Sequence, residues 1–300
     1  MIERFANNPL IYPSLCSSIG SNINGPSVIR VPDWVEAPLG QYYMYFAHHD
    51  GQFIRLAYSD ALEGPWRIYK PGVLALEHSF FHGHIASPDV HVDQAARQIR
   101  LYFHGADART QCNEPQYTRL ALSSDGLHFS AKPEVLGNPY MRLFQHNGWW
   151  YGLAMPGVFY RSLTGLSDFV RGPTLFTEAM RHCAVRLVEQ NLQVIYTNVG
   201  DAPESLLISN IAIADDWMQW HSEAPRVLLQ PELPYEGAAL ACRPSVRGMA
   251  DTVRNELRDP CLFDAGDDLV SDGGGDSGGG VYLFYAVAGE TGIAGARLSG

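Results

Sequence analysis

The chain has 300 residues, of which 46% are hydrophobic and 18% charged. That is enough apolar material for a large core and too little charge for a disordered protein. The net charge is −11 without any basic block, which argues against nucleic acid or an anionic membrane as a partner. No run of about 18 apolar residues occurs, so no transmembrane helix is expected.

Two further features concern the cellular compartment. The segment 1–8 lacks the basic and apolar regions of a secretory signal, so we expect a cytoplasmic protein. The five cysteines form an odd count without a CxxC pair, which predicts reduced thiols and no structural zinc knuckle.

A strand pattern repeats five times along the chain. The clearest strands are rich in Tyr, Phe, Val and Ile and lie at 41–47, 98–104, 148–154, 192–198 and 281–287. Each is followed by a partner strand, at 54–58, 118–122, 158–162, 205–209 and 293–297. Each is preceded by a short apolar strand, at 26–30, 88–92, 141–144, 184–188 and 260–263.

Four of these units end in an aromatic outer strand, predicted at 65–69, 128–129, 168–170 and 217–220. The fifth has none, and Leu10-Ile11-Tyr12 is predicted to supply it and close a ring. Five four-stranded units predict an all-β, single-domain, five-bladed β-propeller over 1–300. Its blades span about 24–70, 86–131, 140–175, 182–222 and 258–300 with 9–15. A β-sandwich is the alternative, which the fivefold repeat disfavours. A short helix is expected at 248–257 and a glycine-rich loop at 272–280.

Polar residues gather at positions that a propeller brings to one face. The starts of the inner strands, the loops between second and third strands and the blade crossovers all meet there. These positions hold Asn24, His48, His49, His82, His84, Asp89, His104, Arg142, His182, Arg258 and Asp259. A single acid at a strand start often only caps a turn. The prediction of a site therefore rests on the fact that polar residues from several blades meet on the same face.

The inner-strand starts resemble motifs of a known group of enzymes. Asn-Gly-Pro-Ser-Val at 24–28, Ala-Ser-Pro-Asp-Val at 86–90 and Arg-Asp-Pro-Cys-Leu at 258–262 are similar to those of five-bladed propeller glycoside hydrolases, families 43 and 117. The strand Tyr-Tyr-Met-Tyr-Phe-Ala at 42–47, with Gly64-Pro65-Trp66 after its partner, is typical of the same group. The resemblance spans all five blades.

This resemblance implies a base carboxylate on blade one, an orienting Asp on blade two and an acid Glu on blade three. One carboxyl protonates the leaving oxygen while another activates water. Asp89 matches blade two, but Gly25 replaces the base and 141–143 carry no Glu. Asp259, aligned with Gly25 by its following proline, is the acid in that register, on blade five. The chain therefore resembles a divergent member of this group, in which the catalytic groups either lie at other positions or are absent.

The first functional hypothesis is a glycoside hydrolase acting on small oligosaccharides, including uronic or sulfated ones, without a required cofactor. Asp259 or Asp89 is the candidate base, and His84 or His82 the candidate acid. The predicted substrate-binding residues are Asn24, His48, His49, His82, His104, Arg142, Tyr160, His182 and Arg258.

Two alternatives stay open. A metal-dependent carbohydrate-active enzyme or lyase would hold a divalent cation in the central channel, with ligands from His48, His84, His104, His182 and Asp89. A non-catalytic carbohydrate-binding propeller would use aromatic side chains such as Trp34, Trp149, Trp150 and Tyr160 to stack on sugar rings.

Overall fold

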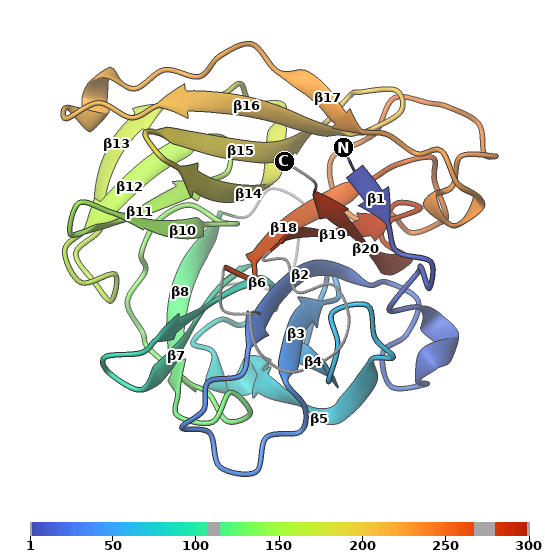
Figure 1. Cartoon of the computed structure of the whole chain (residues 1–300), viewed down its shortest axis with the longest axis horizontal. Helices are drawn as coiled ribbons and strands as arrows, with labels where there is room; N and C mark the ends of the chain where they lie inside the picture. Colours follow the sequence, from blue (N-terminus) through green and yellow to red (C-terminus); the bar gives the residue numbers. More distant parts are fainter. Residues whose placement is uncertain (1, 107–114, 267–279, 299–300) are drawn as a thin grey trace.

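The computed structural model describes residues 2–106, 115–266 and 280–298. Its strands form five antiparallel four-stranded sheets, which follow one another around a central axis (Figure 1). Helical structure in the described residues consists of four single turns of 3-10 helix, Pro13–Leu15, Leu76–His78, Trp217–Gln219 and Pro234–Glu236. The predicted all-β five-bladed propeller is confirmed, whereas the expected helix at 248–257 is wrong. The predicted glycine-rich loop lies outside the described residues, apart from its last residue.

Each blade runs from an inner strand at the axis to an outer strand at the rim (Figure 1). Blades one and two comprise β2 (Asn24–Arg30), β3 (Tyr42–Ala47), β4 (Phe53–Ser59), β5 (Arg67–Ala75), and β6 (His84–Asp93), β7 (Gln98–Ala106), β8 (Gln116–Ser123), β9 (Ser130–Ala131). Blades three and four comprise β10 (Arg142–His146), β11 (Trp149–Ala154), β12 (Val158–Ser162), β13 (Val170–Thr174), and β14 (Met180–Val188), β15 (Asn191–Asn198), β16 (Leu206–Ala212), β17 (Arg226–Leu229). Blade five comprises β18 (Arg258–Asp264), β19 (Val281–Val287), β20 (Gly292–Leu298) and β1 (Ile2–Arg4).

The second strand of each blade lies deepest in the packing between blades. All six residues of β3 are buried, as are six of the seven in β19. A strand covered on both faces has no solvent side, so its sequence is a nearly continuous apolar run instead of an alternation. This is why the second strands were the clearest sequence signal.

An N-terminal strand closes the ring, as predicted, but its residues differ from the prediction. Ile2–Arg4 pairs with β20, and Ile2 lies opposite Leu298. The guanidinium of Arg4 contacts Glu236 and Glu232 in the connection after blade four, at 2.8 and 2.9 Å. Ile11 makes only one bridge, to Ile293 at the start of β20, because β1 already occupies the edge of that strand.

The outer strand of blade four is also displaced from its predicted position. The run 217–220 forms a 3-10 turn whose first N–H groups are capped by Asp216, and the outer strand is β17. Residues three apart in a 3-10 turn lie on the same side. Trp217 and Trp220 therefore both pack into the core formed by blades three and four.

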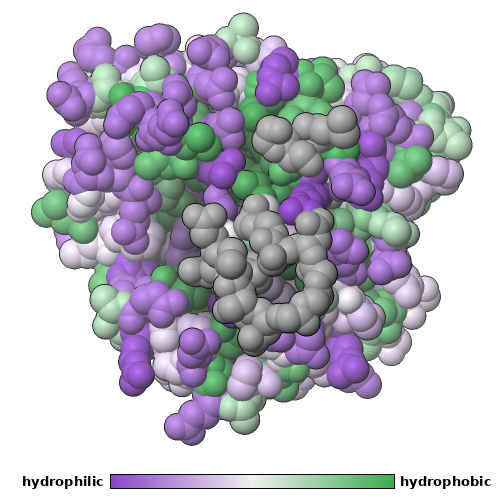
Figure 2. Space-filling model, viewed as in Figure 1, coloured by the Kyte–Doolittle hydropathy of each residue, from purple (hydrophilic) through white to green (hydrophobic). Residues whose placement is uncertain are grey.

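Hydrophilic side chains predominate around the rim of the face seen in Figure 1 (Figure 2). The four cysteines in the described part of the chain are free thiols. None of the helical turns described has the length and apolar character needed to cross a bilayer.

Candidate active site

Each inner strand carries one extra residue near its start, and these bulges define two levels in the channel. In blade one, Asn24 pairs with Ala47 but Ser27 pairs with Tyr45, and the same shift occurs in β6, β14 and β18. In blade three, the Pro139 carbonyl accepts the N–H of Met155 and Arg142 pairs with Leu153, which is the same spacing. A bulge of this kind redirects side chains locally.

The bulges place five residues at one level, which we call the upper ring: Gly25, Ser87, Tyr140, Arg181 and Asp259. Two positions further along each strand lies the lower ring: Ser27, Asp89, Arg142, Cys183 and Cys261. Four upper-ring residues have a positive φ, Gly25, Ser87, Tyr140 and Asp259 at 60°, 43°, 58° and 47°. Three of them are not glycine, a strained arrangement that concentrates at functional sites.

Asp259 forms the central contact of the upper ring. One carboxylate oxygen pairs with Nδ1 of His182, and the other accepts the backbone N–H of Gly25 at 3.2 Å. A side chain at Gly25 would meet the Cα and Oγ of Ser87 at 3.0 and 3.2 Å. At the position of the missing blade-one acid, blade five thus supplies a carboxylate that reaches the backbone of Gly25.

The protonation states of this pair follow from burial and charge. Although burial disfavours the carboxylate, the imidazole of His182 holds the pKa of Asp259 below its usual value. Burial lowers the pKa of His182 despite the neighbouring carboxylate. His182 is therefore a neutral imidazole whose N–H is fixed at Nδ1 by Asp259, and its Nε2 is left as an acceptor.

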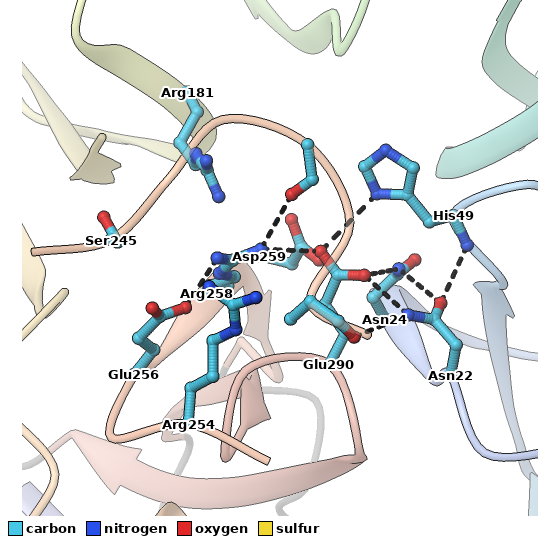
Figure 3. Close-up of polar contacts among 12 residues, drawn as sticks. Asn22, Asn24, His49, Arg181, Ser245, Arg254, Glu256, Arg258, Asp259 and Glu290 are labelled. Atoms are coloured by element: carbon cyan, nitrogen blue, oxygen red, sulfur yellow. Dashed lines mark hydrogen bonds and ion pairs between the residues drawn. The ribbon is translucent and has the colours of Figure 1, made fainter. Parts of the chain in front are cut away.

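A second imidazole–carboxylate pair lies beside the first. Nδ1 of His49, from the loop between β3 and β4, is 3.5 Å from Glu290, which lies in the turn between β19 and β20 (Figure 3). Asn22 and Asn24 also donate to Glu290, at 2.7 and 3.2 Å. Burial opposes charge on both partners, yet their contact raises the pKa of His49 and holds that of Glu290 well below its usual range. His49 thus carries a proton that His182 lacks.

A buried arginine contacts Glu290 of the second pair and two further carboxylates. Arg258 is fully buried and contacts Glu256, Glu290 and Glu204 at 2.5, 2.8 and 3.5 Å (Figure 3). Arg181, in the upper ring, lies 3.6 Å from Glu204 and donates to the Val246 carbonyl. A buried charge of this kind persists only when it is paired. Arg258 was predicted to bind substrate, but its position makes it a support for Glu290.

Aromatic rings connect the remaining blades of the upper ring. The ring of Tyr140 lies between those of His104 and His182, with centroid distances of 3.9 and 4.4 Å. His84 contacts the far side of His104 at 5.7 Å. Burial lowers the pKa of both His84 and His104, so both are neutral near pH 7. Neither ring nitrogen of His104 has a hydrogen-bond partner in the described part of the chain.

The lower ring has a different character. Asp89 accepts the Leu143 N–H and contacts Nε2 of His91, both at 2.8 Å, and lies 3.5 Å from Arg142. Arg142 also donates to the carbonyls of Pro88 and Cys183, so it ties together the inner strands of blades two, three and four. A cavity of about 430 Å³ lies here, lined by residues of all five inner strands.

The structure thus separates the predicted site residues. The upper-ring region unites Asn24, His49, His84, His104, His182, Arg258 and Asp259. Asp89 and Arg142 belong to the lower ring, and Tyr160 lies in the core between blades two and three, where its hydroxyl bonds Asn138. His48 accepts the Asp50 N–H, and His82 is exposed in the segment before β6. No three His, Cys, Asp or Glu side chains among the described residues gather closely enough to hold a metal ion.

Sequence reasoning missed several residues of this site. Tyr140, Arg181, Glu204, Glu256 and Glu290 were not among the predicted site residues. The register of the bulges identifies Tyr140 and Arg181. In the sequence, only the prolines after Gly25, Ser87 and Asp259 indicate this register, and blades three and four lack a proline there.

Comparisons with known proteins agree with the geometry. No family model matches the chain. A thermostable family-43 glycoside hydrolase superimposes with a TM-score of 0.62, at 13% identity over 93% of this chain and 90% of that one. An N-acetylgalactosamine deacetylase from F. plautii, in complex with a blood group B trisaccharide, gives 0.58, at 12% identity over 99% and 94%. The protein is therefore a five-bladed propeller with the fold of the family-43 glycoside hydrolases.

A relative by sequence is an uncharacterized protein of Acanthamoeba polyphaga mimivirus. The two are 32% identical over 334 residues, which cover 99% of this chain and 90% of the relative. The chain belongs to the same family as this mimivirus protein. It shares the propeller fold with the structural neighbours at 12–13% identity.

Proposed function

We propose that this protein hydrolyses glycosidic bonds of small, neutral oligosaccharides, with His182 as general base and His49 as general acid. The observation that carries the proposal is the pair of imidazole–carboxylate contacts in the upper ring, His182 with Asp259 and His49 with Glu290. Their pKa values are shifted in opposite directions, which is how enzymes separate an acid from a base. The family-43 fold supports a sugar as the substrate.

His182 is suited to activate water. Asp259 accepts the Nδ1–H and fixes the ring, so Nε2 presents a lone pair. In the proposed step, Nε2 takes a proton from water while the water oxygen bonds the anomeric carbon of the sugar. Asp259 stays ionised and stabilises the imidazolium that forms.

His49 is suited to release the leaving group. The raised pKa keeps it protonated near pH 6.5, and its side chain is 19% exposed. Its Nε2–H donates a proton to the glycosidic oxygen as the bond to the anomeric carbon breaks. His84, the acid candidate of the sequence, fits this role less well because burial lowers its pKa and leaves it neutral.

The charge of the site favours a neutral sugar over a uronic or sulfated one. Four carboxylates, Asp259, Glu204, Glu256 and Glu290, surround the two guanidiniums of Arg258 and Arg181. Those guanidiniums are already paired with buried carboxylates, so neither is free to bind the anionic group of a uronic or sulfated sugar.

A lyase is the second candidate, since two imidazoles at opposite protonation states can also remove a proton and protonate a leaving oxygen without water.

The experiment is to incubate the protein with neutral, uronic and sulfated oligosaccharides in H₂¹⁸O and to follow the products by mass spectrometry. Hydrolysis of neutral substrates with ¹⁸O incorporated, lost in the His182→Gln and His49→Gln variants, is expected. Unsaturated products without ¹⁸O would establish a lyase. No product, but protection of the fold by one sugar against heating, would support a binding propeller.

A further inference from the structure

Tyr140 is the upper-ring residue that the acid–base assignment leaves unused. It stands at the first bulge position of blade three, where its φ of 58° is unusual for a bulky side chain. Such backbone strain persists only where the surrounding structure fixes it. The contacts around the ring show what fixes it here.

Two imidazoles contact the Tyr140 ring. His104 lies 3.9 Å from the ring centroid at an angle of 34°, and His182 lies 4.4 Å away at 56°. These contacts hold the ring beside the proposed base and leave its hydroxyl as the functional group. Within the described residues, this hydroxyl has no hydrogen-bond partner.

We propose that the Tyr140 hydroxyl donates a hydrogen bond to the water molecule that His182 deprotonates. This inference rests on the proposed hydrolytic function and assigns Tyr140 as a further catalytic residue of that site. The water oxygen would accept from Tyr140 and give its own proton to Nε2 of His182. These two hydrogen bonds restrict the rotation of the water molecule, so that one lone pair of its oxygen points toward the anomeric carbon.

The surroundings make Tyr140 a donor and never a base. Burial, together with the nearby carboxylates of Asp259 and Glu290, raises its pKa, so the phenol keeps its proton at every working pH. The ring contact with His182 places Tyr140 beside the first of the two imidazole pairs. An uncharged donor held rigidly at this point orients water without adding charge to the site.

The test is Tyr140→Phe, which keeps the ring and both imidazole contacts and removes only the hydroxyl. The matched control is Tyr102→Phe, which removes a buried hydroxyl bonded to the Gly165 carbonyl, beside His91, the partner of lower-ring Asp89. Tyr140→Phe is expected to lower kcat about tenfold, the usual value of one hydrogen bond, with KM little changed. In added methanol, its ratio of methanolysis to hydrolysis is expected to rise, whereas the control keeps the wild-type ratio. A structural role would leave that ratio unchanged, and this outcome would overturn the inference.

A second measurement keeps this inference separate from the proposed function. Crystals of the wild type are expected to show an ordered water within hydrogen-bond distance of both the Tyr140 hydroxyl and Nε2 of His182, and crystals of Tyr140→Phe to lack it. If the wild type cleaves none of the oligosaccharides, the hydrolytic function fails, but the water site still decides the role of Tyr140. If no such water is present, Tyr140 does not position it, whatever the activity.

Discussion

Two histidine–aspartate pairs lie at two depths of the same channel. His182 contacts Asp259 of the upper ring, and His91 contacts Asp89 of the lower one. In the lower pair, Asp89 also accepts a backbone N–H from blade three and faces Arg142, so its carboxylate joins strands. In the upper pair, a second imidazole of opposite charge state lies nearby. The same residue types thus serve packing in one ring and form an acid–base set in the other.

The surroundings of the two histidines reinforce this difference. The ring of His91 packs edge-on against Tyr102 and Trp150, at 5.9 and 5.8 Å, and is 26% exposed. His182 is nearly buried against Tyr140. A buried imidazole responds strongly to neighbouring charges, because water screens them less. A motif match therefore indicates a carboxylate in the channel, while its depth decides what the carboxylate does.

The largest expected difference between the two pairs is in catalysis. His182→Gln is expected to lower kcat/KM on the best neutral oligosaccharide by roughly 10²- to 10⁴-fold, the usual contribution of a general base. His91→Gln removes the matching ring of the lower pair and is expected to change kcat/KM little. Thermal unfolding of both variants checks that the fold is retained. Equal losses of activity in the two would contradict the division into two rings.

The second expected difference is in stability, between variants of the buried arginines Arg258 and Arg142. Arg258→Met removes a buried cation that contacts three carboxylates, and is expected to reduce the free energy of unfolding by about 3–5 kcal/mol. Arg142→Met removes bonds to two backbone carbonyls and one carboxylate, and should cost about 1–3 kcal/mol. Urea unfolding measures both. A larger loss for Arg142→Met would mean that the lower ring, and not the carboxylate cluster, dominates the stability of the channel.

The pH dependence of activity sharpens the assignment within the upper ring. His182 must be neutral and its pKa lies below 6.5, whereas His49 must be protonated and its pKa lies above 6.5. The rate should therefore rise with pH through the His182 ionisation, reach a maximum around pH 6.5 and fall through that of His49, each limb by about tenfold per unit. Glu290→Gln removes the charge that raises the pKa of His49, so its alkaline limb should move to lower pH. An alkaline limb that stays in place would remove His49 from the acid role.

The sequence predicted the fold better than the site, for physical reasons. The second strands are buried on both faces, and their apolar runs made the fivefold repeat visible. The outer strand of blade four was missed because Trp217 and Trp220 reach the core from a turn rather than from a strand. In the site, Asp259 could be predicted because the proline that follows it aligns it with Gly25 in blade one. Asp89 was grouped with Asp259, because the one-residue bulge that separates the two levels of the channel leaves little trace in the sequence.

The smallest predicted effect concerns the glycine that replaces the expected blade-one acid. Gly25→Ala is expected to destabilise the protein by about 1–2 kcal/mol, because its positive φ disfavours a side chain. The new Cβ would also lie 3.0 Å from the Cα of Ser87, a tight contact that Ser87 relieves only by moving a few tenths of an ångström. Gly148→Ala is the matched control, with a φ of 77° but no atom within 4 Å of the added Cβ.

The difference in unfolding free energy between Gly25→Ala and Gly148→Ala isolates the collision with Ser87 from the backbone strain that both variants share. Combining Gly25→Ala with Ser87→Gly, which clears the Oγ and Cβ that crowd this position, is expected to recover part of the loss. Equal losses of unfolding free energy in the two single variants would mean that Ser87 in blade two shifts to accommodate the new Cβ without a measurable penalty. In that case crowding by Ser87 would not explain why the blade-one acid is missing, and its absence would have to follow from the carboxylate of Asp259, which already receives the Gly25 N–H.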